Sequence, residues 1–465
     1  MRWGLRDQRT LNTLKKDTNK EYDVAFGEYY RENHTIKSII PAEKIAGNRQ
    51  LNNLMELIIE EAIDRGAMNI DISLDSAGYG IVELRIGKKM VADRLLDKDA
   101  VYGLSIVCRR MAGVDYENEF KSNISGNIRY EYKEYKYDLR CAFINTAQGL
   151  SMSLRILKPA TQLEDIGMLG FPDNVETAFR ESLKANQGLI LVTGATSSGK
   201  TTTQYAGIHT VINEFEHSKN IRTVEDPVEY TVSGVKQSPV NEESGETFSK
   251  ILQAILRGDP DVILVGEIND AETAKTAIRA ATSGHLVMST LHTNNTIEVT
   301  RVMQQYGANY IDLGNALQLV LNQELEDRLC DTCRVERAVT SSENNWIQKR
   351  LGVNDIITVL SEAGGEVDGK KCPDCEGLGY RGSTLIVEML EADYVYQRAL
   401  NKAKDNTFLL EQELLEDPDA NFYPIGRDVF RHLKDGRIDF NTARRIMKKQ
   451  TGEGVNEINK RNEGE

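Results

Sequence analysis

The sequence predicts an α/β protein in which a parallel sheet is covered by helices on both faces and is preceded by a smaller α+β domain. Between residues 176 and 325, short apolar strands alternate with helical segments, as in parallel sheets. From 49 to 158, helical periodicity and strand alternation are mixed instead. The chain has 465 residues, too many for one ordinary domain.

Composition divides the chain into seven segments. Glycine and proline gather in one short stretch, which predicts a linker, and four cysteines gather in another. The expected order is a polar arm at 1–48, the α+β domain at 49–158, the linker at 159–175, the α/β core at 176–325, a cysteine-bearing insert at 326–385, a helical region at 386–450 and a disordered tail at 451–465.

The α+β domain is predicted from local periodicity. Leucine and isoleucine recur at helical spacing from 51 to 63. Apolar and polar residues alternate at 70–74 and 81–86, as in half-buried strands. A second helix is expected at 100–113 and several strands at 126–157.

Charge and hydropathy exclude some classes of protein. The chain carries 71 acidic and 57 basic side chains, a net charge of -14, whereas proteins that wrap nucleic acid are usually basic. No stretch approaches the roughly 20 apolar residues of a membrane span, and no signal peptide opens the sequence. The chain is therefore expected in the cytoplasm, with direct nucleic-acid binding disfavoured.

The first twenty residues are basic on an otherwise acidic chain. Six arginines and lysines stand there against two aspartates. Such an arm can meet an acidic partner or anionic lipid, or it can simply be a solvated leader.

A phosphate-binding loop follows the apolar strand at 188–193. Its glycines let backbone N–H groups close around a phosphate, at the positive N-terminus of the next helix. Lys200 is expected to reach the β- and γ-phosphates of ATP, and the Thr201 hydroxyl to bind Mg²⁺. The alternative is a chance match in a Gly/Ser loop. The expected nucleotide-binding residues are Gly194, Ala195, Thr196, Ser197, Ser198, Gly199, Lys200, Thr201 and Thr202.

Two acidic segments follow other apolar strands. Glu267 ends the segment 261–267, at the edge where open α/β sheets bind ligands. Glu225, Asp226 and Glu229 follow a strand that begins near 221, and such carboxylates suit Mg²⁺ and an attacking water. The alternatives are an acid that merely ends a strand and an exposed acidic turn.

Two histidines flank a predicted core strand within 283–293. His292 lies at its C-terminal end, where an imidazole can bond the γ-phosphate. His285 is expected to be structural.

Four cysteines form two CxxC pairs, which can supply a tetrahedral thiolate site for structural Zn²⁺. Reduced thiols or redox pairs are the alternative reading. Cys108 and Cys141 lack such spacing and are expected in the core. The predicted metal ligands are Cys330, Cys333, Cys372 and Cys375.

These motifs, in this order, resemble the ATPases of type II secretion and type IV pilus assembly. The resemblance extends from about residue 50 to about residue 450 and implies a RecA-like core with a PAS-like preceding domain. It also implies that Glu229 activates water, that Glu267 is the Walker B acid and that His292 senses the γ-phosphate. The tetracysteine insert favours assembly or export over retraction.

The resemblance further implies partners. Six copies would form a ring that uses Mg-ATP, with Arg140 and Arg155 as arginine fingers. Both arginines could instead pair with acids. The ring would act on an inner-membrane platform protein, could also contact other pilus or secretion subunits, and would lie at the membrane periphery.

Some residues depart from the family pattern. Asn269 replaces an arginine after the Walker B acid, and Gln323–Glu326 replaces a more basic run. Three alternative functions stay open: a conjugation or DNA-uptake motor, a ring helicase, and a structural subunit that binds nucleotide with little turnover.

Overall fold

The computed structural model describes residues 48–75, 78–114, 124–157, 165–241, 244–404 and 406–450. The predicted arm up to residue 47, the first part of the predicted linker and the predicted tail lie outside these residues. The chain divides into two compact units, Met1–Pro159 and Ala160–Glu465.

The N-terminal unit is built from one antiparallel sheet and two helices. Its elements are α5 (Arg49–Asp64), β1 (Asn69–Leu74), β2 (Gly80–Ile86), β3 (Lys89–Leu96), α6 (Lys98–Met111), β4 (Ile124–Tyr132), β5 (Tyr135–Thr146) and β6 (Gly149–Leu157). The sheet order is β3-β2-β1-β6-β5-β4. The strand β3 escaped prediction because its alternation is weak.

One face of this sheet is covered and the other is polar. Alternate residues of β1 are buried, including Ile70 and Ile72, and they join α5 and α6 in one apolar core. Cys108 and Cys141 lie in this core, as predicted, with their sulfur atoms 3.9 Å apart.

The C-terminal unit holds the larger sheet. Its first elements are η2 (Ile166–Leu169), α7 (Asp173–Lys184), β7 (Gly188–Thr193), α8 (Lys200–Glu214), β8 (Ile221–Glu225), β9 (Lys236–Pro239), α9 (Phe248–Leu256), β10 (Val262–Val265), α10 (Ala271–Thr282), β11 (Leu286–Leu291), α11 (Glu298–Gln305), α12 (Tyr310–Ala316) and β12 (Leu317–Leu329). The remaining elements are β13 (Val335–Ala338), α13 (Ser341–Leu351), β14 (Val359–Glu362), β15 (Glu366–Val367), β16 (Lys370–Lys371), β17 (Tyr380–Glu391), α14 (Tyr394–Ala403), α15 (Thr407–Glu416), β18 (Phe422–Tyr423), α16 (Ile425–Lys434) and α17 (Phe440–Gln450).

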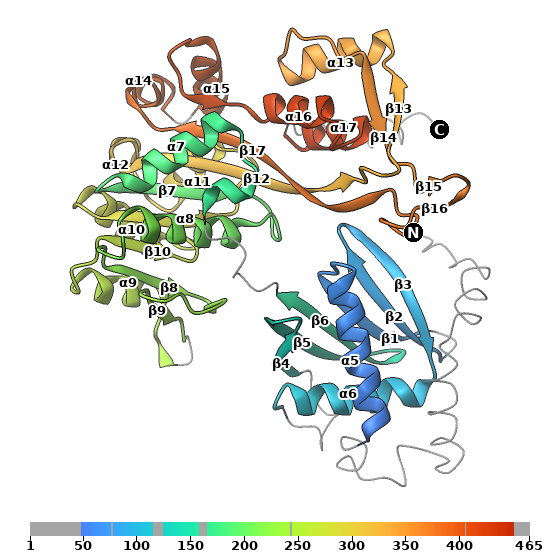
Figure 1. The fold of residues 1–465 in the computed structure, drawn as a ribbon. Helices are drawn as coiled ribbons and strands as arrows, with labels where there is room; N and C mark the ends of the chain where they lie inside the picture. Colours follow the sequence, from blue (N-terminus) through green and yellow to red (C-terminus); the bar gives the residue numbers. More distant parts are fainter. Residues whose placement is uncertain are drawn as a thin grey trace. The chain divides into compact units, whose positions relative to one another are not determined.

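The strand order is β18-β17-β12-β7-β11-β10-β8-β9. The six strands from β12 to β9 run parallel, and β17 pairs antiparallel with β12. Helices cover both faces of this sheet (Figure 1). One apolar core joins it to α9, α10, α11, α12, α14 and α15, and a second core joins the other face to η2, α7 and α8. The predicted doubly covered α/β fold is therefore confirmed.

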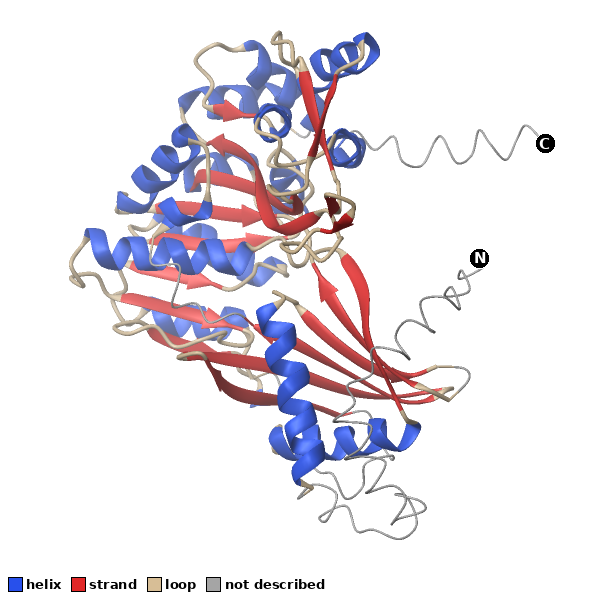
Figure 2. Ribbon diagram, turned by 45° about the vertical axis from the view of Figure 1, so that its right-hand side comes forward, coloured by secondary structure: helices blue, strands red, loops and turns tan. Residues whose placement is uncertain are grey.

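Two long strands cross the expected segment boundaries. β12 continues past residue 325, and β17 occupies the start of the region expected to be helical; Figure 1 labels both strands. Figure 2 distinguishes the helices (blue) from the strands (red) of each unit. β12 and β17 stay paired over most of their length, so the boundaries at 325/326 and 385/386 both fall inside strands. Beyond them, α13, α16, α17 and β14 enclose a third apolar core. Of the helices that the structure describes, none combines the length and hydropathy of a membrane span.

A buried carboxylate on α16 forms a hydrogen bond with the backbone of β17. Asp428 is fully buried and accepts hydrogen bonds from Val387 N (2.9 Å) and Arg431 Nε (2.7 Å). Burial alone would raise the pKa of Asp428, but the hydrogen bonds and charges of His432 and Arg431 outweigh it and hold this pKa below its usual value.

A lowered folded-state pKa means that the charged form stabilises the fold above the unfolded value of about 3.9. This contribution is lost as the pH falls through the folded-state pKa. Asp428→Asn is expected to cost about 3–5 kcal/mol at pH 7. When this variant and the unmodified protein are unfolded with denaturant, the difference between their free energies of unfolding should be smaller at pH 3 than at pH 7. Asp435→Asn, at an exposed position after the same helix, should cost little at either pH. An equal loss from Asp428→Asn at both pH values would contradict the assignment.

Candidate nucleotide site and cysteine cluster

Four predicted motifs meet at one edge of the large sheet. The strands β7, β11, β10 and β8 are neighbours and run parallel, so their C-terminal ends lie together. The phosphate loop follows β7, the segment with His292 follows β11, Glu267 follows β10, and the acidic segment follows β8. This is the edge at which open α/β sheets bind their ligands.

The backbone of the loop is shaped as a cradle. Gly194 (φ 136°) and Gly199 (φ 89°) take conformations that favour glycine, and Ser197 is left-handed at φ 64°. A Cβ added at Gly194 would lie 2.2 Å from the carbonyl oxygen of Gln323. Gly199 caps α8 without a side-chain hydrogen bond to the first turn. These features fit a bound phosphate group at the start of the helix.

The lysine of the loop lies against the cradle. Lys200 Nζ donates to the carbonyl oxygens of Gly194 (2.8 Å) and Ala195 (2.9 Å). Burial lowers the pKa of Lys200, and the charge of Glu267 opposes this shift. The next residues, Thr201 and Thr202, are exposed, so their hydroxyls can be reached by a ligand.

Glu267 and His292 come together at the ends of two neighbouring strands. His292 Nε2 lies 3.7 Å from Glu267 Oε2, and both side chains are partly open to solvent. Asn269 Nδ2 donates to the other carboxylate oxygen of Glu267 at 3.0 Å. Asn269, which stands where the family pattern has an arginine, therefore orients the carboxylate of Glu267 through a hydrogen bond from an uncharged amide. His285 instead bonds the carbonyl of Ala280 through its ring, 3.1 Å away, as expected for a structural histidine.

Glu225 differs from the other acids, because its carboxylate is enclosed. It is 4% exposed and accepts hydrogen bonds from Tyr205 Oη, Thr223 Oγ1 and Gln237 Nε2. Burial, together with the hydrogen bond to Glu225, raises the pKa of Tyr205. These hydrogen bonds make Glu225 an anchor for the segment that follows, and its contact with the cofactor stays a prediction.

The other two acids of the segment are more open. Asp226 is exposed and Glu229 is half-buried. Gln237 Nε2 also donates to the carbonyl of Tyr230 at 3.0 Å, which holds the backbone beside Glu229. Tyr205 and Gln237 were missed at the sequence level, because neither belongs to a recognisable motif.

Two further residues were not predicted as site residues: Gln323 was named only as part of a departure from the family pattern, and Asn322 was not named at all. Asn322 and Gln323 lie in β12 and bond the segments around the phosphate loop. No local signal marks an amide on a strand as part of a site.

The two predicted arginine fingers lie in the N-terminal unit. Arg140 on β5 and Arg155 on β6 are directly opposite each other, so both belong to the same face of that sheet. Asn127 and Asn69 occupy the flanking positions of this row.

The four predicted ligand cysteines are brought together in the C-terminal unit. All are buried, and their sulfur atoms lie within 4.8 Å of one another. Cys330 and Cys372 are 3.9 Å apart, and Cys333 and Cys375 are 3.5 Å apart. Tetrahedral Zn²⁺ with Zn–S bonds of about 2.3 Å places its sulfur ligands about 3.8 Å apart, so the cluster fits this ion.

Backbone groups support the cluster. Gly365 N and Gly379 N each donate to a cysteine sulfur at 3.2 Å. Gly377, Gly379 and Gly382 all have positive φ, a conformation that favours glycine, in the turns after the second CxxC pair.

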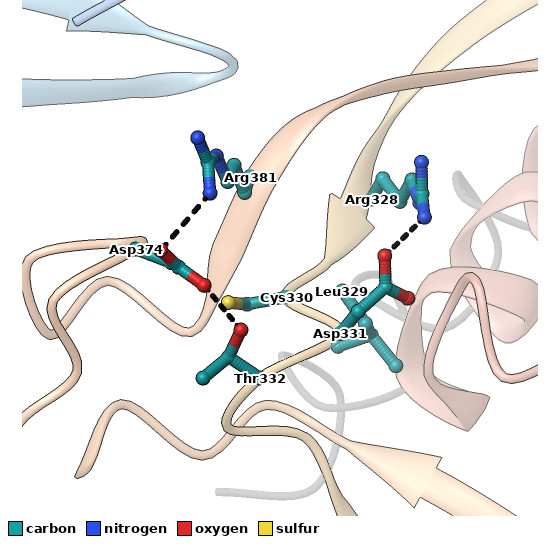
Figure 3. A pocket seen from close by; sticks show the side chains of 7 residues that line it. All are labelled: Arg328, Leu329, Cys330, Asp331, Thr332, Asp374 and Arg381. Atoms are coloured by element: carbon teal, nitrogen blue, oxygen red, sulfur yellow. Dashed lines mark hydrogen bonds and ion pairs between the residues drawn. The ribbon is translucent and has the colours of Figure 1, made fainter. Parts of the chain in front are cut away.

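A pocket of about 380 Å³ opens beside the cluster. Figure 3 shows two ion pairs on its walls: Arg381 with Asp374 at 3.2 Å, and Arg328 with Asp331. Thr332 also donates to Asp374. Because the two arginines face two aspartates, the lining has no excess charge with which to select an anion.

Comparison with known proteins gives relatives over most of the chain. The model of the family described as "Type II/IV secretion system protein" matches residues 44–431. The type IV pilus assembly ATPase PilB of Thermus thermophilus is 35% identical over 360 residues, which are 76% of this chain and 38% of that protein. The type II secretion system ATPase E of Vibrio cholerae is 34% identical over 400 residues, 85% of this chain and 75% of its own.

A solved structure shares the fold. The ATPase DotB of Legionella pneumophila superposes with a TM-score of 0.61 at 18% identity, covering 85% of this chain and 95% of its own. The chain spans well under half the length of the Thermus relative.

Proposed function

The chain belongs to the type II/IV secretion system protein family, and we propose that it is an ATP-hydrolysing motor that powers type IV pilus assembly or type II protein secretion. The observation that supports this most directly is the meeting of four motifs at the ends of β7, β11, β10 and β8. They bring a phosphate cradle, a lysine, several carboxylates and a histidine to one edge.

The loop is proposed to hold the phosphates of ATP. Its backbone N–H groups and Lys200 would balance the charge of the phosphates, and the Thr201 hydroxyl would be a ligand of Mg²⁺. The buried Ser198 Oγ has no hydrogen-bond partner within the described residues, so it is available to a bound group. The metal would neutralise charge that develops as the terminal phosphoryl group leaves.

The proton-handling groups surround this cradle. Glu229 would accept the proton of the attacking water, and Glu267 would bind the Mg²⁺ shell. His292, 3.7 Å from Glu267, would bond the γ-phosphate and lose that bond after hydrolysis.

The assembly is proposed on the family resemblance. Six copies would form a ring in which Arg140 and Arg155 reach a nucleotide and stabilise its charge. Their shared position on one face of the N-terminal sheet is compatible with this role. The ring would act at the inner membrane through a platform protein and, with it, other pilus or secretion subunits. The cysteine cluster would hold a structural Zn²⁺.

The proposal is tested by measuring phosphate release with Mg-ATP across a size-exclusion separation. Turnover is expected in a ring-sized peak, with at least a 100-fold loss in Lys200→Ala, because the loop would lose its phosphate-balancing charge. Arg257→Ala changes a basic residue outside the phosphate loop and should leave the rate unchanged.

Two outcomes would point elsewhere. ATP binding without turnover in any fraction would favour a structural subunit. Stimulation by single-stranded DNA at physiological salt would favour a nucleic-acid motor such as a helicase or a DNA-transfer ATPase.

A further inference from the structure

A buried glutamine on β12 bonds the phosphate loop at two points. Gln323 is 1% exposed. Its Nε2 donates to the carbonyl oxygen of Ser198 at 2.8 Å, and its Oε1 accepts from Thr203 Oγ1 at 2.9 Å. One side chain thus joins the loop itself to the first turn of α8.

The backbone of the same residue supports the start of the loop. A Cβ added at Gly194 would lie only 2.2 Å from the carbonyl oxygen of Gln323, and a Cβ added at Gly199 would lie 3.2 Å from Gln323 Nε2. Both glycines of the loop are therefore packed against this strand. A side chain at Gly194 would collide with the backbone of β12, whereas one at Gly199 would press on the side chains of Gln323 and Leu325.

The preceding residue holds the neighbouring segments. Asn322 Nδ2 donates to Thr193 Oγ1 at 2.9 Å and to the carbonyl of Thr293 at 3.1 Å. Thr193 ends the strand before the loop, and Thr293 directly follows His292. Consecutive amides of β12 therefore fasten both the loop and the histidine segment.

The hydrogen-bond chemistry explains why an amide is needed. In a phosphate cradle the N–H groups point inward, so carbonyls such as that of Ser198 point away and need a donor. A glutamine amide offers that donor and an acceptor for Thr203 at once. A glutamate would lose the donor and add negative charge beside bound phosphates.

We propose that Gln323 is a positioning residue that holds the phosphate loop in its nucleotide-binding conformation. This inference rests on the proposed nucleotide binding and names a residue that sets its affinity. Gln323 acts through the loop and does not itself contact the phosphates.

The test is the affinity of a fluorescent ATP analogue and of its ADP counterpart for the full chain. Gln323→Met keeps the length of the side chain but leaves the Ser198 carbonyl and the Thr203 hydroxyl without partners. It is expected to weaken both affinities about tenfold, because each buried polar group left unpaired is costly. Thr203→Val removes one of the two bonds and should weaken binding about threefold.

The matched control is Gln318→Met, the same substitution on the same strand. Gln318 packs against Gly188 at the other end of β7, and its Oε1 has no hydrogen-bond partner among the described residues. It should leave both affinities unchanged. Thermal unfolding of each variant separates lost folding from lost positioning.

The outcomes discriminate between the two proposals. Unchanged affinity in both Gln323→Met and Thr203→Val, with the unmodified protein binding normally, overturns the positioning role alone. Equal weakening in Gln318→Met overturns it as well, since the effect would then be general to the strand. If the unmodified protein binds neither nucleotide, the proposed function fails, and this inference fails with it.

Discussion

Replacing Glu229 by glutamine is expected to lower ATP turnover about 10²–10⁴-fold while ATP binding persists. Glutamine has nearly the same shape but cannot accept a proton from water. The backbone of the segment that carries Glu229 is held on both sides of this residue, because the side chain of Gln237 donates hydrogen bonds to the Glu225 carboxylate and to the carbonyl of Tyr230. The substitution should therefore change the chemistry of the site and leave its structure intact.

The measurement is single-turnover hydrolysis beside binding of a fluorescent ATP analogue. Glu181→Gln removes an exposed carboxylate on α7 and should leave both quantities unchanged. A Glu229→Gln protein that hydrolyses ATP at the normal rate would assign the proton-accepting role to another carboxylate, with Glu267 the next to examine.

Removing the metal from the proposed cysteine site is expected to unfold the two segments that carry the cysteines, 330–334 and 364–379. The four sulfur atoms gather where β12 ends and β17 begins. Among the described residues, the partly buried hydrophobic side chains packed against them are Val367 and Leu378. So small a cluster supplies little hydrophobic stabilisation, whereas structural Zn²⁺ in small domains contributes about 10–16 kcal/mol of binding free energy. Metal binding would therefore dominate the stability of this region.

Cys372→Ser should reduce the bound zinc from one ion per chain to a small fraction and should make the segments 330–334 and 364–379 susceptible to protease. The helix α13 and the strand β14 should stay protected in their own apolar core. The control is Cys108→Ser, which changes a cysteine in the core of the N-terminal unit. This variant should bind as much zinc as the unmodified protein. Elemental analysis that finds no metal in freshly purified, reduced protein would contradict the tetrathiolate assignment.

Much of the fold follows from local sequence patterns. The strands β7, β10 and β11 are short apolar runs, fully buried in the sheet, and each was expected within a few residues of its observed bounds. The strand β3 and the continuation of β12 and β17 were missed. These segments form strands because they pair with neighbouring strands, and the alternation of apolar and polar residues within them does not predict that pairing.

Local sequence patterns are enough to predict the motifs of the candidate site: a glycine-rich loop between a strand and a helix, acids at strand ends, and two CxxC pairs. These patterns are local, because each needs residues only a few positions apart. The enclosure of Glu225, the greater exposure of Glu229 and the hydrogen bonds from Gln323 to the loop depend on contacts between distant segments. Gln323 meets Ser198 across 125 residues of sequence. This contact forms because β12 lies next to β7 in the sheet. The residue types and their spacing along the chain do not predict which strands become neighbours.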